Sequence, residues 1–86
     1  MNTVELLEAA VDLARRAGYQ VRQEWLGGSG GGGCTLKGRR ILFVDLALGP
    51  MDQLEHALNA LRHDPEAARL PMPHPLRELL ALRKSA

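Results

Sequence analysis

The sequence predicts a two-layer α+β fold in which helices cover one face of a three-stranded antiparallel meander. Two observations predict it. Apolar residues recur at helical spacing at both ends of residues 1–70, and three short segments with strand patterns lie between them. The 86-residue chain has room for one small domain. We expect this domain over residues 1–70, followed by a proline-rich arm over residues 71–86.

The first expected element is an amphipathic helix over residues 3–17, where apolar residues recur at three- and four-residue steps. Asn2 is a good N-cap residue, and Glu5 follows at the position that completes a capping box. Gly18 suits the left-handed conformation that ends many helices. The sequence therefore marks both ends of this helix.

Three strands are expected next. Residues 19–26 alternate between apolar and polar side chains, and a short strand around residues 34–36 ends in a tight turn. The third strand, residues 40–46, contains a continuous apolar run that is typical of burial on both faces. An edge position in a meander does not suit such a strand. Either the strand order differs from 1-2-3, or a partner chain or the C-terminal arm covers this strand.

The C-terminal half of the sequence predicts a helix followed by an extended arm. Pro50 opens a helix expected over residues 51–63, and Asp64-Pro65 ends it before a short further turn. Prolines at 71, 73 and 75 then force an extended path. Residues 76–82 are expected to form a last short helix.

A glycine-rich tract follows the first strand. It matches pieces of the dinucleotide fingerprint, the P-loop and the nucleophile elbow, but each of these motifs needs a helix after it, and here a strand follows. We expect a flexible hairpin loop; the alternative is a tract whose bare backbone lets another chain or an anionic ligand approach closely. The tract consists of Gly27, Gly28, Gly30, Gly31, Gly32 and Gly33, with Ser29 between.

No catalytic constellation of nucleophile, base and orienting third group is visible. His56 and His63 share one helix face with Asp52 and Asn59, but two imidazoles two turns apart are too distant to share one ion. We therefore expect a solvated face, no metal and no cofactor. Cys34 is the single cysteine, so it cannot form an internal disulfide, and a packing role is expected.

Asp45 is the one acid inside an apolar strand. The order helix, three strands, helix over residues 3–63 resembles the core of restriction-endonuclease-like nucleases, in which a strand acid and an E-x-K pair hold Mg²⁺. No E-x-K follows Asp45, so the catalytic residues do not carry over. We expect the Asp45 carboxylate to accept hydrogen bonds from backbone at the strand's end. The stretch 26–58 is similar to small bacterial proteins of unassigned function, a resemblance that implies no activity.

Composition excludes some classes of function. The chain is 45% hydrophobic and 24% charged, which is ordinary for a globular domain. The net charge of +1 argues against bulk electrostatic binding to nucleic acid. No apolar run reaches the length of a membrane span, and the N-terminal residues lack the pattern of a signal peptide. We expect a cytoplasmic protein with no membrane partner.

The main hypothesis is a small, non-enzymatic, bacterial-type interaction domain that forms a homodimer, because so short a chain has a thin core. Trp25, Leu42 and Phe43 are the expected interface anchors, since large apolar side chains carry most interface energy. The alternative is a nucleic-acid or anion-binding module. It would use a basic hairpin made of Lys37, Arg39 and Arg40.

Overall fold

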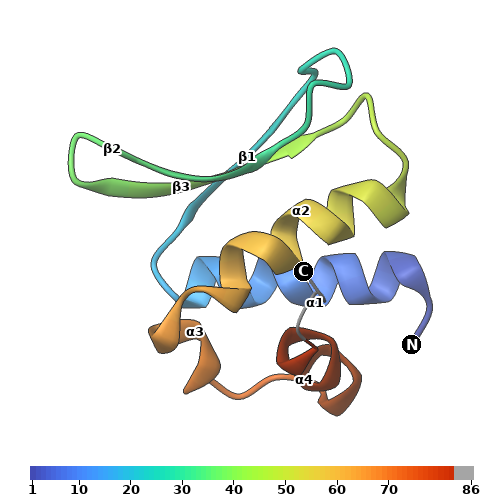
Figure 1. Cartoon of the computed structure of the whole chain (residues 1–86), viewed down its shortest axis with the longest axis vertical. Helices are drawn as coiled ribbons and strands as arrows, with labels where there is room; N and C mark the ends of the chain where they lie inside the picture. The colour runs from blue at the N-terminus through green and yellow to red at the C-terminus, as the bar shows by residue number, and fades with distance from the viewer. Residues whose placement is uncertain (83–86) are drawn as a thin grey trace.

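The computed structural model describes residues 1–82 as a small α+β domain (Figure 1). The elements lie close to the predicted positions, and the α+β class is confirmed. They are α1 (Thr3–Arg16), β1 (Gln20–Glu24), β2 (Gly32–Leu36), β3 (Arg39–Asp45), α2 (Pro50–Arg62), α3 (Pro65–Ala68) and α4 (His74–Ala81).

The sheet is mixed, with strand order β1-β3-β2. β1 pairs with β3 in parallel, and β2 pairs with β3 in antiparallel orientation. The predicted antiparallel meander is therefore wrong. Because β3 lies between the other two strands, its continuous apolar run has neighbours on both sides, and the first of the two explanations given for that run is correct.

This strand order also changes the structural role of the glycine-rich tract. β1 and β2 each pair with β3 and not with one another, so the tract is not a hairpin loop but a connection between the two edges of the sheet. The hairpin of this fold joins β2 to β3. Its two turn residues, Lys37 (φ 51°) and Gly38 (φ 77°), both have positive φ, as a type I′ turn requires.

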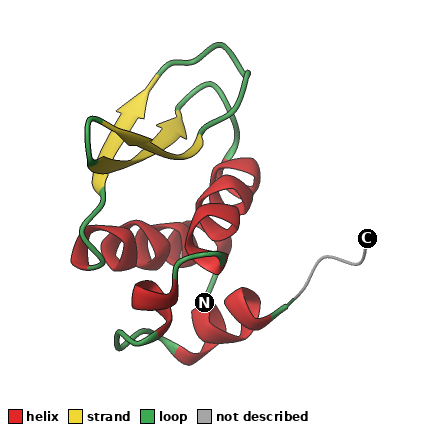
Figure 2. Ribbon diagram, turned by 60° about the vertical axis from the view of Figure 1, so that its left-hand side comes forward, coloured by secondary structure: helices red, strands yellow, loops and turns green. Residues whose placement is uncertain are grey.

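Helices cover one face of the sheet and leave the other face uncovered (Figure 2). On the covered face, Leu42 and Val44 of β3 pack into a core with Leu13 of α1 and Leu58 of α2. Alternation along β3 turns Ile41 and Phe43 toward the uncovered side. We call that side the open face.

Local sequence signals fix the first helix as predicted. The Asn2 side chain accepts a hydrogen bond from the Glu5 N–H at 2.8 Å, and the Glu5 side chain accepts one from the Asn2 N–H at 3.0 Å. Gly18 follows the helix with a φ of 97°. The capping box therefore fixes the start of α1, and Gly18 ends the helix and leads the chain into β1.

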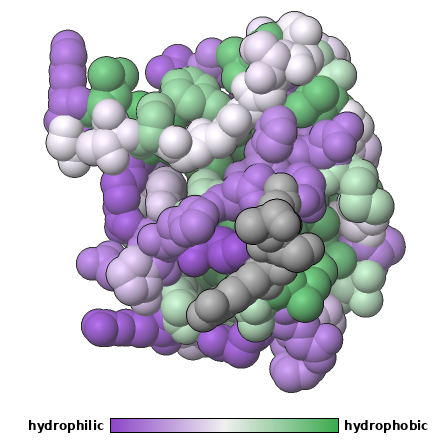
Figure 3. Space-filling view, viewed as in Figure 1, coloured by the Kyte–Doolittle hydropathy of each residue, from purple (hydrophilic) through white to green (hydrophobic). Residues whose placement is uncertain are grey.

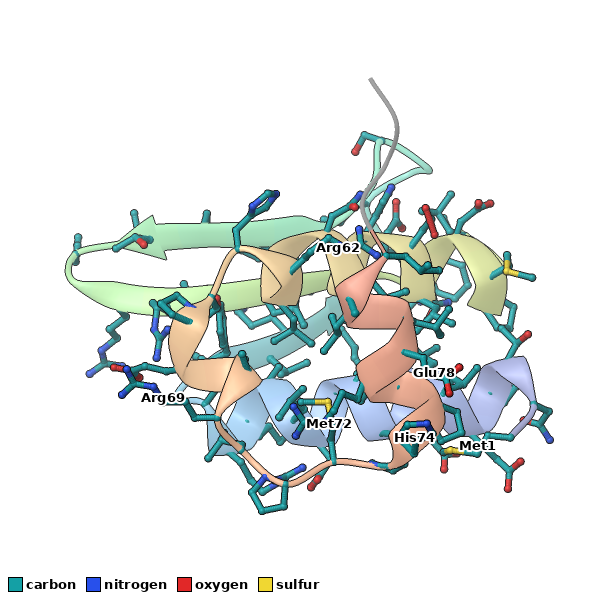
Figure 4. The ribbon with its side chains drawn as sticks, turned by 60° about the horizontal axis from the view of Figure 1, so that its bottom comes forward. Met1, Arg62, Arg69, Met72, His74 and Glu78 are labelled. Carbon is teal, nitrogen blue, oxygen red and sulfur yellow. The ribbon has the colours of Figure 1, made fainter. Side chains whose placement is uncertain are left out.

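The proline-rich arm packs on its own domain. Leu76 of α4 is completely buried in the core. Arg62 of α2 donates a hydrogen bond to the Leu79 carbonyl at 3.0 Å, which ties α4 to α2. Figure 4 shows α4 crossing α1 and α2, with His74 and Glu78 on this short helix, where the His74 Nε2 and Glu78 Oε1 atoms lie 2.6 Å apart. Residues 83–86 of the predicted arm lie outside the described residues.

We expect Leu76→Ala to lower the free energy of unfolding by about 3 kcal/mol, because it empties a fully enclosed leucine site. Chemical denaturation followed by circular dichroism measures the loss. Leu82→Ala is the matched control: Leu82 is 61% exposed, so its truncation should change stability by less than about 0.5 kcal/mol. Equal losses in the two variants would show that the arm does not depend on Leu76 for docking.

Candidate functional site

Asp45 ends β3 and organises the loop that follows β1. Its side chain is buried, with 1% of its surface exposed. Oδ1 accepts hydrogen bonds from the N–H groups of Leu26 and Ala47, and Oδ2 accepts them from Gly28 and Gly30. The N···O distances lie between 2.9 and 3.1 Å. The prediction that this carboxylate binds backbone is confirmed.

These bonds change the acidity of Asp45. Burial raises the pKa of the carboxyl, but the four backbone donors outweigh burial and lower the pKa below its ordinary value. The carboxylate is thus ionised and fully occupied by donors, so it offers no group for catalysis. It also ties Gly28 and Gly30 of the glycine-rich tract to the end of β3.

A hydrogen bond to His56 fixes Gly31, near the C-terminal end of the glycine-rich tract. The Gly31 N–H donates to Nδ1 of His56 at 2.9 Å. An Nδ1 that accepts a hydrogen bond carries no proton, so the ring N–H of His56 is on Nε2. His56 is half-buried against the loop. The prediction of a wholly solvated histidine face is therefore wrong at this position.

A groove runs between α2 and β2, with a volume of about 450 Å³. The β2–β3 hairpin projects beyond the helices on the left of Figures 1 and 3 and overhangs the groove, and Figure 3 shows hydrophilic and hydrophobic side chains together on that hairpin. We call this cavity the α2–β2 groove. It is lined by Tyr19, Gly31, Gly32, Gly33, Cys34, Thr35, Arg40, His56, Asn59, Ala60 and His63.

Arg40 lines the groove and is already engaged. Its guanidinium donates to the Asp64 carboxylate and to the Ala17 carbonyl, and it lies 4.7 Å from the centre of the Tyr19 ring. A weaker contact reaches Glu66 at 3.3 Å. The network links the hairpin to the ends of α1 and α2.

The pKa values of two groups in this network, Asp64 and Tyr19, are shifted. Burial opposes ionisation of Asp64, but the hydrogen bond from the Tyr19 hydroxyl, a backbone N–H donor and the Arg40 charge lower the pKa of its carboxyl. Burial, with the hydrogen bond to Asp64, raises the pKa of Tyr19. Tyr19 is therefore protonated and acts as a donor.

The predicted basic hairpin does not form one patch. Lys37 and Arg39 are exposed at the hairpin tip, whereas Arg40 lies on the helix side and is bound by Asp64. The structure thus leaves two of the three predicted cations together.

The predicted interface anchors are also separated. Leu42 is completely buried in the core, so it is not on a surface of this structure. Phe43 is half-buried on the open face, where the Arg22 guanidinium lies 5.6 Å from the ring centre. Trp25, one residue beyond β1, is 75% exposed.

Residues 1–82 contain no group of three His, Cys, Asp or Glu side chains placed to hold a metal ion. Within the same residues, no helix has the length and apolarity needed to cross a membrane. Comparisons with protein-family models, with curated proteins and with solved structures found no match to this chain.

The α2–β2 groove was not foreseen from the sequence. The sequence showed that His56, Asn59 and His63 share one face of α2. It did not show that β2, which lies far from them along the chain, forms the other wall of the groove. One signal was present: the glycines at the start of β2 carry no side chain that would fill the space above α2. At Gly33, a Cβ atom would stand 3.0 Å from the Cβ of Ala60, so a larger residue would push the strand off the helix.

Proposed function

We propose that this protein is a small cytoplasmic, non-enzymatic interaction domain that forms a homodimer through the open face of its sheet. The observation that carries the proposal is the one-sided cover of the sheet. The middle of the open face is apolar: Phe43 on the central strand is half-buried, and Cys34 and Leu36 on β2 are exposed. Ile41 lies beside them but is already buried, with 4% of its surface exposed. Leu36 is 54% exposed.

The border of the open face has the composition of an interface rim. Arg22 covers part of Phe43 and pairs with Glu24 at 2.6 Å. Arg39 stands opposite Leu36 at the other end of the face. An apolar centre with an aromatic residue, surrounded by arginine, is typical of surfaces that bind another protein. Burial of this face in a dimer would add apolar contact to a thin core.

We expect Phe43→Asp to convert the dimer into a monomer, because a carboxylate at the centre of the interface would be buried without a partner. The dissociation constant should rise at least about thirtyfold, as for loss of a central interface residue. Sedimentation equilibrium over a concentration series measures it.

Met51→Asp is the matched control, since Met51 is an exposed apolar residue on α2, away from the sheet. It should leave the dimer intact. Leu36→Asp provides a second test on the open face, at a side chain exposed enough to tolerate the change. A wild-type chain that stays monomeric at all concentrations, or a folded Phe43→Asp variant of unchanged mass, would contradict the proposal.

The alternative, a nucleic-acid or anion binder at the hairpin tip, has less support because Arg40 is occupied by Asp64. Lys37 and Arg39 remain available for phosphate contacts. This alternative predicts an affinity for short DNA or RNA that falls steeply with salt, and the dependence would vanish in a variant with both residues changed to glutamate.

A further inference from the structure

We propose that the α2–β2 groove binds an extended acidic peptide, which adds as a further strand to the free edge of β2. This site differs from the open face, so it does not depend on the homodimer proposed above. The argument uses the hydrogen-bonding groups of the β2 edge, the shape of the groove and the side chains of α2.

The edge of β2 presents unpaired backbone groups. In a hairpin with a two-residue turn, the pair that flanks the turn, here Leu36 and Arg39, exchanges hydrogen bonds. Alternation then directs the N–H and C=O groups of Cys34 toward β3 and those of Gly33 and Thr35 away from it. The outward edge therefore offers alternating donors and acceptors at strand spacing, which is the template for strand addition.

The groove leaves room for a strand at this edge. Gly31, Gly32, Gly33 and Thr35 line the groove along this edge, and its volume of about 450 Å³ lies in the range of ligand sites. A small anion would satisfy only the donors of such an edge. An extended peptide satisfies both donors and acceptors, so it fits the edge better.

The floor of the groove favours an acidic side chain. The lining residues include no carboxylate, and because Arg40 is paired with Asp64, the donors left for a ligand are those of the α2 side chains. His56 has its proton on Nε2, because Nδ1 accepts from Gly31. Oδ1 of Asn59 accepts from Arg62 at 3.0 Å, which leaves its amide N–H groups as donors. Among residues 1–82 neither donor has a hydrogen-bond acceptor, so both are available to a carboxylate.

The probe is a short synthetic peptide of alternating threonine and valine with one central glutamate, compared with the same peptide carrying a central lysine. Each is titrated into the ¹⁵N-labelled full chain while amide shifts are recorded. We expect the Gly33 and Thr35 amide signals to move downfield and to exchange slowly with solvent. The glutamate peptide should bind about tenfold more tightly than the lysine peptide.

Three variants distinguish the contribution of the β2 edge from that of the α2 side chains. Thr35→Pro removes an outward N–H without removing a bond to β3, and should weaken binding about tenfold or more, whereas Thr35→Val keeps that N–H and should bind normally. Asn59→Asp keeps the acceptor for Arg62 but replaces the amide donors by an anion. It should reverse the preference for glutamate over lysine. If Thr35→Pro does not fold, the Asn59→Asp result decides.

Three results would overturn the proposal. The first is no movement of the Gly33 and Thr35 amides at about 1 mM of either peptide. The second is equal affinity of folded Thr35→Pro and Thr35→Val for the glutamate peptide. The third is an unchanged glutamate preference in Asn59→Asp. Repeating the titration with Phe43→Asp keeps the test separate from the homodimer, since that variant alters only the open face.

Discussion

Asp45→Asn is expected to lower the melting temperature by about 10 °C. The carboxylate accepts four backbone N–H bonds inside the fold, and the asparagine amide would turn one of its acceptor atoms into a donor that faces other donors. Buried donors left without acceptors are costly. Thermal unfolding followed by circular dichroism gives the shift, and faster hydrogen exchange at Gly28 and Gly30 would locate it.

The matched control is Asp12→Asn, which makes the same chemical change at an exposed carboxylate on α1 that pairs with Arg16. It should move the melting temperature little, because exposed ion pairs contribute little to stability. If both variants melt together with the wild type, the Asp45 bonds do not hold the loop.

The same bonds give a direction for pH dependence. The pKa of Asp45 is lower in the folded chain than in the unfolded chain, where it is about 3.9. Its contribution to stability is therefore complete above that value and is lost as pH falls through the folded pKa. Asp64 acts with the same sign. Asp45→Asn should make the acid branch of a stability-against-pH curve shallower without removing it, since Asp64 remains.

Gly31→Ala is expected to lower the free energy of unfolding by about 3 kcal/mol. A Cβ atom at this position would stand 2.0 Å from the carbonyl oxygen of Phe43 and 2.8 Å from its carbonyl carbon. Both are backbone atoms of the central strand, so neither can move without disturbing the sheet. Urea denaturation measures the loss, and a shifted His56 ring signal would report that its bond to Gly31 has broken.

Gly49→Ser provides the control for adding a side chain at a glycine. No atom lies within 4 Å of a Cβ at Gly49, and serine is a good N-cap residue for α2. Stability should hold or rise slightly. A Gly31→Ala variant that is as stable as Gly49→Ser would mean that Gly31 does not lie as close to the Phe43 backbone as described.

The sequence predicted each element well because the signals are local. The capping box of Asn2 and Glu5, the glycine after α1 and the turn before β3 each act within a few residues of the position that they fix. Local sequence signals do not determine which strands lie beside a given strand. Alternation and apolar runs report how deeply a strand is buried, not which strand lies beside it. The run Ile41–Val44 did not suit an edge strand, but it did not show that β3 lies in the middle of the sheet or that β1 pairs with it in parallel.

The candidate sites were harder to predict for the same reason. Arg40 and Arg39 are adjacent in sequence, but alternation sends their side chains to opposite faces, so three nearby cations did not form one patch. His56 could be placed on a helix face but not opposite Gly31, because that contact depends on how α2 lies under β2. The conformation of the glycine-rich tract depends on its hydrogen bonds to Asp45, which is the last residue of β3 and lies well beyond the tract in the sequence.

The position of β3 has a consequence for how the chain folds. The strand that is last in the sequence is the middle strand of the sheet, so β1 and β2 have no strand to pair with until Asp45 has been synthesised. The β2–β3 hairpin is local and can close within microseconds. The parallel pairing of β1 with β3 closes a longer loop and should follow it. Chains that end before β3 contain two edge strands and no sheet, so they are expected to stay unfolded.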